Sequence, residues 1–513
     1  MRKLLLYVAV ILTLKVAHGQ TQSTFQLTCG KGTGQSVQQT KDKGFIILGC
    51  APGSATGINL IKIDSLGVYQ WSGFYDSSGN GSSSLYGYSV QQTNDGGYII
   101  TGQISYSSVS NEDIILLKTT SNGTLQWQKY FDFSATDYGY SVQQTNDGGF
   151  IVTGYADSNV VLLKTASDGS LQWTKIFTGP SSQEGKCVRQ TNDGGFIITG
   201  FTTSFGAGIF DVYLIKTDSL GTLQWTKTYG GTAKDFGNSV LQTTDGGYII
   251  AGSTSSYGAG GDDVYLVKTD SSGNLQWTKT FGGPQSDAGN SIIQTTDKGF
   301  IITGTTHSFG TGNNDIYLVK TDSSGTLQWT KTFGGTGDEA GSSVVQTNDG
   351  GFVVNGYTTS SFATYGTDMY LIKTDNAGNS PCYETSPASI EGSGGTQSSG
   401  GTEGPGGTIG AIAYVGMNFG FTIKTICPPA GVNEISENEL IKIYPNPFSE
   451  ILNIDFDGTG KTVLTFYNLL GEKLEDRQIN PGLNIIDVHN LPQGIFIAKI
   501  ISGSSCVSKK LSK

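Results

Sequence analysis

The sequence predicts an all-β protein: a seven-bladed β-propeller followed by a linker and a small C-terminal β-sandwich. A phrase of the form Gln-Thr-x-Asp recurs seven times, with its glutamines at Gln39, Gln92, Gln144, Gln190, Gln242, Gln294 and Gln346. The steps between them are 53, 52, 46, 52, 52 and 52 residues, and such a period marks a repeat architecture. The chain holds 75 glycines and is only 14% charged, which suggests short strands joined by tight turns.

One repeat unit, residues 238–283, shows how each blade is built. The stretches 238–243, 248–252, 264–269 and 275–281, which turn signals separate, predict four strands. Between the first two strands stands Thr-Asp-Gly-Gly, and between the last two Asp-Ser-Ser-Gly; both predict hairpin turns because glycine accepts positive φ. Four antiparallel strands in about 50 residues make one propeller blade. A stacked solenoid is the rival architecture, and seven units with a closing strand favour the ring.

All six tryptophans of the chain occupy the same place in the fourth strand, where we expect each to wedge between blades: Trp71, Trp127, Trp173, Trp225, Trp277 and Trp329. The seventh unit lacks this strand, because Asn-Ser-Pro-Cys at 379–382 stands in its place and proline cannot donate to a ladder. Residues 23–30 resemble the missing strand, with Phe25 in the tryptophan position. We therefore expect an N-terminal strand to complete the last blade and remove the open edge.

The repeat text Asp-Val-Tyr-Leu-Val-Lys-Thr-Asp, followed by Gly, Leu and Trp, resembles a bacterial β-propeller repeat family. The resemblance extends over residues 23–387, and we assign 20–387 to the propeller. It implies the fold and leaves the activity open, because function depends on sites grafted onto a fold.

The N-terminus, residues 1–19, is typical of a signal peptide. Arg2 and Lys3 precede an apolar stretch over 4–14, and small residues at 17 and 19 predict cleavage before Gln20. That stretch is too short for a mature membrane span, and we expect no transmembrane segment in the mature chain.

Residues 388–440 are predicted to be a Gly/Ser-rich flexible linker, although the role of 411–426 cannot be assigned. Cys382 and Cys427 flank its glycine-rich part, and we expect a disulfide between them in an oxidising compartment. Six cysteines allow 15 pairings, so the sequence alone does not fix this one. No CxxC spacing occurs, and no metal site is predicted.

The tail, residues 441–513, carries short strands with turn signals that suggest a small β-sandwich. Its text opens with Tyr444, Pro445, Asn446 and Pro447, contains Leu-Pro-x-Gly-Ile-Phe around Gly494, and ends with Lys509 and Lys510. These features resemble the type A sorting domain of the type IX secretion system. The resemblance implies a Bacteroidetes bacterium, Sec export, handling by the type IX secretion machinery, and release or attachment at the outer cell surface. The alternative is an ordinary C-terminal binding sandwich.

The charge of −11 argues against nucleic acid as a partner, since binding to nucleic acid needs a basic face. The chain contains no HExxH, GxSxG or phosphate loop, so we predict neither catalytic residues nor a cofactor. The turn Asp-Ser-Ser-Gly departs by one residue from the Asp-box of sialidases, and the propeller has one arginine where a sialidase needs several. We therefore reject a sialidase.

Acidic and aromatic residues recur in the loops that join second to third strands. The sequence predicts a ligand site from Phe205, Tyr257 and Phe309, which could stack on sugar rings, beside Asp211, Asp263 and Asp315. The aspartates could also bind a cation, act as a carboxylate pair or cap the loops, and their repetition favours capping. Our leading hypothesis is a non-enzymatic binding or adhesion propeller for a glycan or protein. The alternatives are a secreted polysaccharide-degrading enzyme, hydrolase or lyase, and a structural surface-layer protein.

Overall fold

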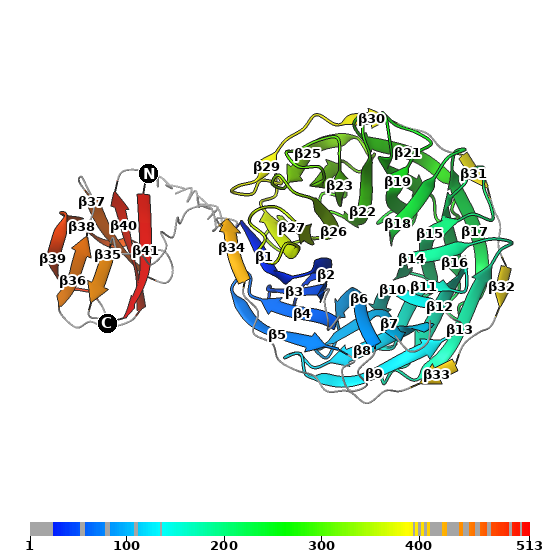
Figure 1. Ribbon diagram of the computed structural model, residues 1–513, viewed down its shortest axis with the longest axis horizontal. Helices are drawn as coiled ribbons and strands as arrows, with labels where there is room; N and C mark the ends of the chain where they lie inside the picture. Colours follow the sequence, from blue (N-terminus) through cyan, green and yellow to red (C-terminus); the bar gives the residue numbers. More distant parts are fainter. Residues whose placement is uncertain are drawn as a thin grey trace, which may run out of the picture.

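The computed structural model shows seven sheets arranged in a ring, with their first strands innermost (Figure 1). It describes residues 24–51, 57–76, 83–106, 111–133, 136–392, 396–398, 402–404, 408–410, 423–427, 441–444, 451–456, 462–468, 473–491, 495–502 and 505–512. The predicted signal peptide, Pro445 to Pro447 and Gly494 lie outside these residues. In the part of the chain that is described, no helix has the length and apolar character that a membrane crossing requires.

Blades 1 to 3 each consist of four consecutive antiparallel strands. Blade 1 holds β2 (Thr33–Gln39), β3 (Phe45–Ala51), β4 (Gly57–Ile63) and β5 (Tyr69–Tyr75). Blade 2 holds β6 (Ser83–Gln92), β7 (Tyr98–Tyr106), β8 (Asn111–Thr119) and β9 (Leu125–Asp132). Blade 3 holds β10 (Asp137–Gln144), β11 (Phe150–Ala156), β12 (Asn159–Thr165) and β13 (Leu171–Thr178).

Blades 4 to 6 repeat this plan. Blade 4 holds β14 (Gln183–Gln190), β15 (Phe196–Thr202), β16 (Asp211–Thr217) and β17 (Leu223–Gly230). Blade 5 holds β18 (Asp235–Gln242), β19 (Tyr248–Thr254), β20 (Asp263–Thr269) and β21 (Leu275–Gly282). Blade 6 holds β22 (Asp287–Gln294), β23 (Phe300–Thr306), β24 (Asp315–Thr321) and β25 (Leu327–Phe333).

Blade 7 is completed by the N-terminus. Its strands are β26 (Glu339–Gln346), β27 (Phe352–Thr358), β28 (Asp368–Thr374) and then β1 (Phe25–Lys31). Strand β1 pairs antiparallel with β28, so that Phe25 lies opposite Lys373 and Leu27 opposite Leu371. The predicted closure of the last blade by this segment is confirmed.

The recurring glutamine connects neighbouring blades. In every blade a backbone N–H of the turn between the first two strands donates to the glutamine Oε1 of the next blade. The last of these bonds, from Asn348 N to Gln39 Oε1 at 2.9 Å, runs from blade 7 back to blade 1. The Gln side chain is therefore needed in all seven units, since each amide joins two blades.

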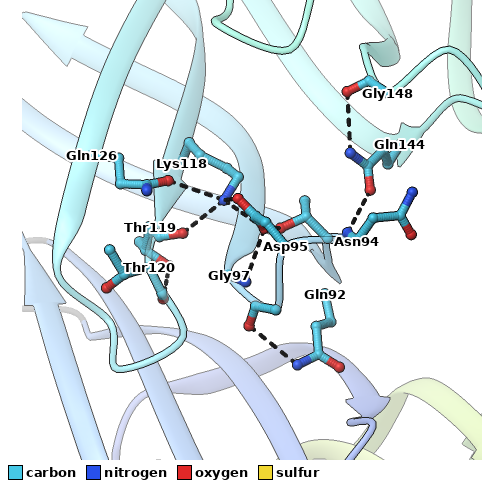
Figure 2. Close-up of polar contacts among 12 residues, drawn as sticks. Gln92, Asn94, Asp95, Gly97, Lys118, Thr119, Thr120, Gln126, Gln144 and Gly148 are labelled. Carbon is cyan, nitrogen blue, oxygen red and sulfur yellow. Dashed lines mark hydrogen bonds and ion pairs between the residues drawn. The ribbon is translucent and has the colours of Figure 1, made fainter.

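The aspartate of the same phrase pairs with the lysine of the third strand, as Figure 2 shows for blade 2. Lys118 Nζ lies 2.9 Å from Asp95 Oδ2 and also donates to the backbone oxygen of Thr119. Burial alone would raise the pKa of Asp95, but hydrogen bonds from Thr93, Lys118 and Gly97 outweigh it and lower the pKa to about 2. The equivalent ion pair occurs in every blade.

The segment expected to be a flexible linker adds a further strand to the outside of five blades, and residues just before it add one to a sixth. Along the perimeter these strands are β29 (Glu384–Thr385), β30 (Ile390–Gly392), β31 (Thr396–Ser398), β32 (Thr402–Gly404), β33 (Thr408–Gly410) and β34 (Ile423–Cys427). They pair in turn with the outer strands of blades 6, 5, 4, 3, 2 and 7 (Figure 1). We call these six strands the belt. Backbone hydrogen bonds hold it, and such bonds need no apolar pattern in the sequence.

The C-terminal region contains two antiparallel sheets. One is formed by β35 (Ile441–Tyr444), β36 (Ile451–Phe456) and β39 (Gly482–Asp487). The other contains β38 (Lys473–Ile479), β37 (Thr462–Asn468), β40 (Ile495–Ser502) and β41 (Ser505–Ser512). A single apolar core includes Leu452 from the first sheet and Leu464, Phe466 and Ala498 from the second.

Candidate binding site

The predicted aspartates are buried and hold the loops that precede them. Asp211, Asp263 and Asp315 begin the third strands of blades 4, 5 and 6 and are at most 2% exposed. Each carboxylate accepts a backbone N–H from its own loop, for example from Ala259 to Asp263 at 2.8 Å and from Gly312 to Asp315 at 3.0 Å. The carboxylates therefore cap the loops, as their repetition indicated.

Burial also disfavours ionisation of these aspartates. It raises the pKa of Asp263 to about 6, with the nearby charge of Asp287 adding to the effect. Asp315 also has a pKa raised to about 6, through burial and the charge of Glu339. In each case the second acid belongs to the next blade, so the two carboxyl groups meet at a blade junction.

The predicted aromatic residues fold over their own blades and are not gathered into one site. Phe205 lies against Tyr213 with ring centroids 6.0 Å apart, and Phe309 against Tyr317 at 5.9 Å. Tyr257 repeats the arrangement and donates its hydroxyl to a backbone oxygen of blade 4. The three rings pack against three different core clusters. Their role in binding stays a prediction.

A group of aromatic rings that the sequence reasoning missed spans blades 2 to 5. We call it the aromatic cluster and define it as Tyr88, Tyr138, Tyr140, Tyr155, Phe201, Phe210 and Phe236, all of them half-buried. Ring centroids lie 5.1–5.9 Å apart along two runs, one of tyrosines and one of phenylalanines. Lys186 bridges the runs, with its Nζ 3.9 Å from the Tyr140 ring and 5.9 Å from the Phe201 ring.

The cluster depends on a bulge that opens the first strand of each blade. Pairing slips between Gly139 and Ser141, so Tyr140 has no partner on the second strand and its side chain is re-aimed. The glycine is required, because a Cβ on Gly139 would come within 2.4 Å of the Thr101 hydroxyl on the neighbouring blade. The same bulge presents Tyr88 in blade 2 and Lys186 in blade 4.

The bulged position differs on the other side of the ring. Blades 6 and 7 carry Asn290 and Ser342 at this position. The residue before the bulge glycine is also small in both blades, Ala288 and Ala340. The large rings are therefore concentrated in one sector, blades 2 to 5, although blade 7 carries Tyr357 at the position of Tyr155 and Phe201. The sequence does contain a sign of this cluster: the two residues on either side of the glycine in the phrase x-Gly-x-Ser differ from blade to blade. Such variation is not visible when only the recurring residues are compared.

Polar groups lie directly beside the rings. The Tyr88 hydroxyl donates to Gln103 Oε1 at 2.6 Å, and Gln103 Nε2 donates to Glu112 Oε1 at 3.2 Å. The Tyr138 hydroxyl donates to Glu112, and Glu184 forms a 2.6 Å ion pair with Lys186. Burial, reinforced by neighbouring acids, raises the pKa of Tyr138 and Tyr140 above the ordinary value, so both remain hydroxyl donors at neutral pH.

Three carboxylates next to this sector come close together. Asp113, Asp132 and Asp137 each offer an oxygen within 4.8 Å of the others, a donor set of the kind that divalent cations accept. Burial and the charge of Asp132 raise the pKa of Asp113 to about 6. Asp137 also accepts the backbone N–H of Phe133 at 2.7 Å, so part of this group serves to hold the loop between blades 2 and 3.

Comparisons with known proteins identify a family for the C-terminal region. Residues 442–513 match the family model described as a secretion system C-terminal sorting domain. A search of curated proteins finds no match. Among solved structures, the chain is similar to the NanB sialidase of Streptococcus pneumoniae, in a mutant form, at 10% identity with a TM-score of 0.37, covering 70% of this chain and 69% of that one.

Two further solved structures are similar at the same low level. NanB in complex with Optactamide gives 10% identity and a TM-score of 0.38, covering 68% of this chain and 70% of that one. A protein assigned as a gluconolactonase gives 10% identity and a TM-score of 0.29, covering 51% and 84%. The chain is therefore a seven-bladed β-propeller protein that carries a type IX secretion C-terminal sorting domain and is exported to the cell surface or the medium.

Proposed function

We propose that this exported propeller is a non-enzymatic binding protein and that its ligand is a glycan held on the aromatic cluster. The observation that carries the proposal is the contact of seven half-buried rings with one another across blades 2 to 5, with Lys186 between the two runs. A purely structural requirement would recur in nearly every blade, as the glutamines do in seven and the tryptophans in six. Rings that occur in one sector of a sevenfold scaffold are better explained by a ligand.

The chemistry of the cluster suits a carbohydrate. Sugar rings present C–H faces that pack on aromatic rings and hydroxyls that donate to carboxylates. Glu112 and Glu184 supply the acceptors, and Lys186 supplies a donor between the two runs of rings. These side chains come from strands, whose rigidity reduces the entropy lost when a ligand binds.

A second candidate is a polysaccharide-degrading enzyme. One observation favours it: the Tyr138 hydroxyl donates to Glu112, and the charge of Glu184 also helps to raise the pKa of this hydroxyl, so both acids belong to the surroundings of one ring. Glycoside cleavage uses a pair of carboxylates on either side of the scissile bond. This candidate function uses the same residues as the binding proposal. It differs in that the protein would cleave the polysaccharide as well as bind it.

Binding is tested with the full mature chain on an array of neutral and uronic-acid-containing polysaccharides. Tyr140→Ala and Phe201→Ala should each weaken binding at least about tenfold, because alanine truncation of a central aromatic contact residue commonly costs about 2 kcal/mol or more. Asn290→Ala and Ser342→Ala change the equivalent bulged positions of blades 6 and 7 and should leave binding unchanged. Equal binding by all four variants would remove the aromatic cluster from consideration.

The same ligands decide between binding and cleavage. The array hits are incubated with wild-type protein, and new reducing ends or unsaturated products are measured. Products that disappear in Glu112→Gln or Glu184→Gln would establish the enzyme. Binding without products supports the proposal.

A further inference from the structure

We propose that the central cavity of the propeller is a second binding site and that it takes a small carboxylate. The cavity, of about 220 Å³, is lined by first strands of blades 1, 2, 3, 4, 6 and 7. It is separate from the aromatic cluster in its lining residues, so the inference does not depend on the glycan proposal.

Three glutamines that line this cavity keep hydrogen-bond donors available. Gln38, Gln91 and Gln143 occupy equivalent positions in blades 1 to 3 and line the cavity. The Oε1 of each accepts the backbone N–H of the next blade, at 2.5–2.7 Å. A side-chain amide has one oxygen and one NH₂ group, so fixing the oxygen to the backbone leaves the NH₂ group as the one available to a ligand. Among the described residues, no hydrogen bond is recorded for any of these three Nε2 atoms.

Arg189 takes the same position in blade 4 and adds a positive charge to these donors. Its Nη1 donates to the Val188 backbone oxygen at 2.8 Å and lies 3.5 Å from the Ser141 hydroxyl. A guanidinium has five N–H groups in a planar fork, so donors remain for a ligand. Among the described residues, those that line the cavity include no aspartate or glutamate. The wall formed by blades 1 to 4 therefore offers hydrogen-bond donors and a positive charge without an acidic neighbour.

The wall formed by blades 6 and 7 is more apolar, with two isoleucines and two valines beside Ser291 and Ser343. The equivalent positions of blades 6 and 7 are Ile293 and Val345, and both line the cavity. A ligand that satisfies both walls has an anionic group at one end and a short apolar body at the other. The geometry points to a short-chain carboxylate, whose two oxygens match the guanidinium fork.

The test compares propionate with its neutral isostere propionamide by isothermal titration calorimetry on the full mature chain at constant ionic strength. We expect propionate to bind and propionamide to bind at least about tenfold more weakly, because hydrogen bonds to a charged group are the stronger ones. Arg189→Gln should reduce propionate affinity by a similar factor. This variant gives blade 4 the residue that blades 1 to 3 already carry, and its unfolding midpoint is measured to verify the fold.

The site is located by soaking crystals with 3-bromopropionate and recording anomalous scattering. A bromine peak inside the cavity, with the carboxylate at Arg189, supports the proposal. Equal binding of propionate and propionamide, unchanged affinity in Arg189→Gln, a bromine peak elsewhere, or complete displacement by equimolar chloride would overturn it. Should Arg189→Gln fail to fold, Arg189→Lys keeps the charge and should retain more affinity for propionate than for propionamide. Phe201→Ala should bind propionate normally, which keeps this result independent of the glycan site.

Discussion

Phe25 packs edge-on against Phe45, with ring centroids 6.4 Å apart and ring planes 70° apart. The contact joins blade 7 to blade 1, and it occupies the place in which the six tryptophans each contact the first aromatic residue of the next blade's second strand. The ring of seven aromatic pairs is therefore closed by a residue near the N-terminus.

Phe25→Ala should destabilise the propeller by about 3–5 kcal/mol, since it removes a fully buried ring and leaves a cavity. Urea unfolding of the full mature chain measures the effect. Phe25→Trp restores the residue of the other six blades and should lose much less. A loss below 1 kcal/mol for Phe25→Ala would show that β1 contributes little to closing the ring.

The expected disulfide between Cys382 and Cys427 gains support from the position of Gln26. Cys427 lies opposite Gln26 in the pairing of β34 with β1, and the Gln26 amide donates to the Cys382 backbone oxygen. Cys382 is disulfide-bonded, whereas Cys29, Cys50 and Cys187 are free.

Peptide mapping without reduction should therefore recover a linked pair from 382 and 427. Cys382→Ser should lower stability by about 3–4 kcal/mol, the range for closing a loop of this size. Cys187→Ser is the matched control at a free, buried thiol. A linked peptide joining 382 to 506 would contradict the pairing.

Stability should fall as the pH rises from about 4 to about 6. The pKa of Asp263 is about 6 in the folded chain and about 3.9 when unfolded, so between these values the folded state binds more protons. Asp113 and Asp315 act in the same direction, and Asp95, with a pKa of about 2, stays ionised throughout this range.

We expect Asp263→Asn to raise the melting temperature at pH 7.5 by roughly 2 °C and to flatten its pH dependence, because the amide avoids the cost of a buried charge. Differential scanning calorimetry at pH 5 and 7.5 measures both effects. Asp95→Asn should instead lower the melting temperature at both values. An Asp263→Asn variant that keeps the full pH dependence would contradict the assignment.

Deleting residues 442–513 should leave the protein in the periplasm of a host that has the type IX system, because the sorting domain is what that system handles. Fractionation and surface labelling measure the location. Deleting 391–410 serves as the control, since it leaves the sorting domain in place. Full surface display of the truncated chain would refute the requirement.

The blades were predictable because their residues recur for reasons that act in every unit. The glutamine joins blades and the aspartate pairs with lysine in all seven units, and the tryptophan packs on the neighbouring blade in six, so each recurs visibly in the sequence. Closure by Phe25 was predictable from one missing tryptophan strand. The aromatic cluster was not, because it arises where the units differ, at positions such as Tyr140 and Asn290.

The belt escaped prediction because its strands are two to five residues long and its middle strands consist mainly of glycine, serine and threonine. Backbone pairing leaves little trace in such a composition. A periodic signal does exist: Gly-Gly-Thr occurs at 394–396, 400–402 and 406–408, in steps of six residues. Each of these threonines begins a belt strand, so one short repeat accompanies one blade.

The course of the belt has a mechanical consequence. The chain leaves the propeller at β34, after running along the rim past blades 6 to 2, and continues toward the sorting domain. With Cys382 joined to Cys427, a pull on the C-terminal end passes through the disulfide to the end of blade 7 and leaves the belt between the two cysteines without load. In a reduced chain the same force would act on the pairing of β34 with β1 and then on the short belt strands, which would detach one after another. The state of one disulfide therefore decides whether force on the sorting domain reaches the rim of the propeller.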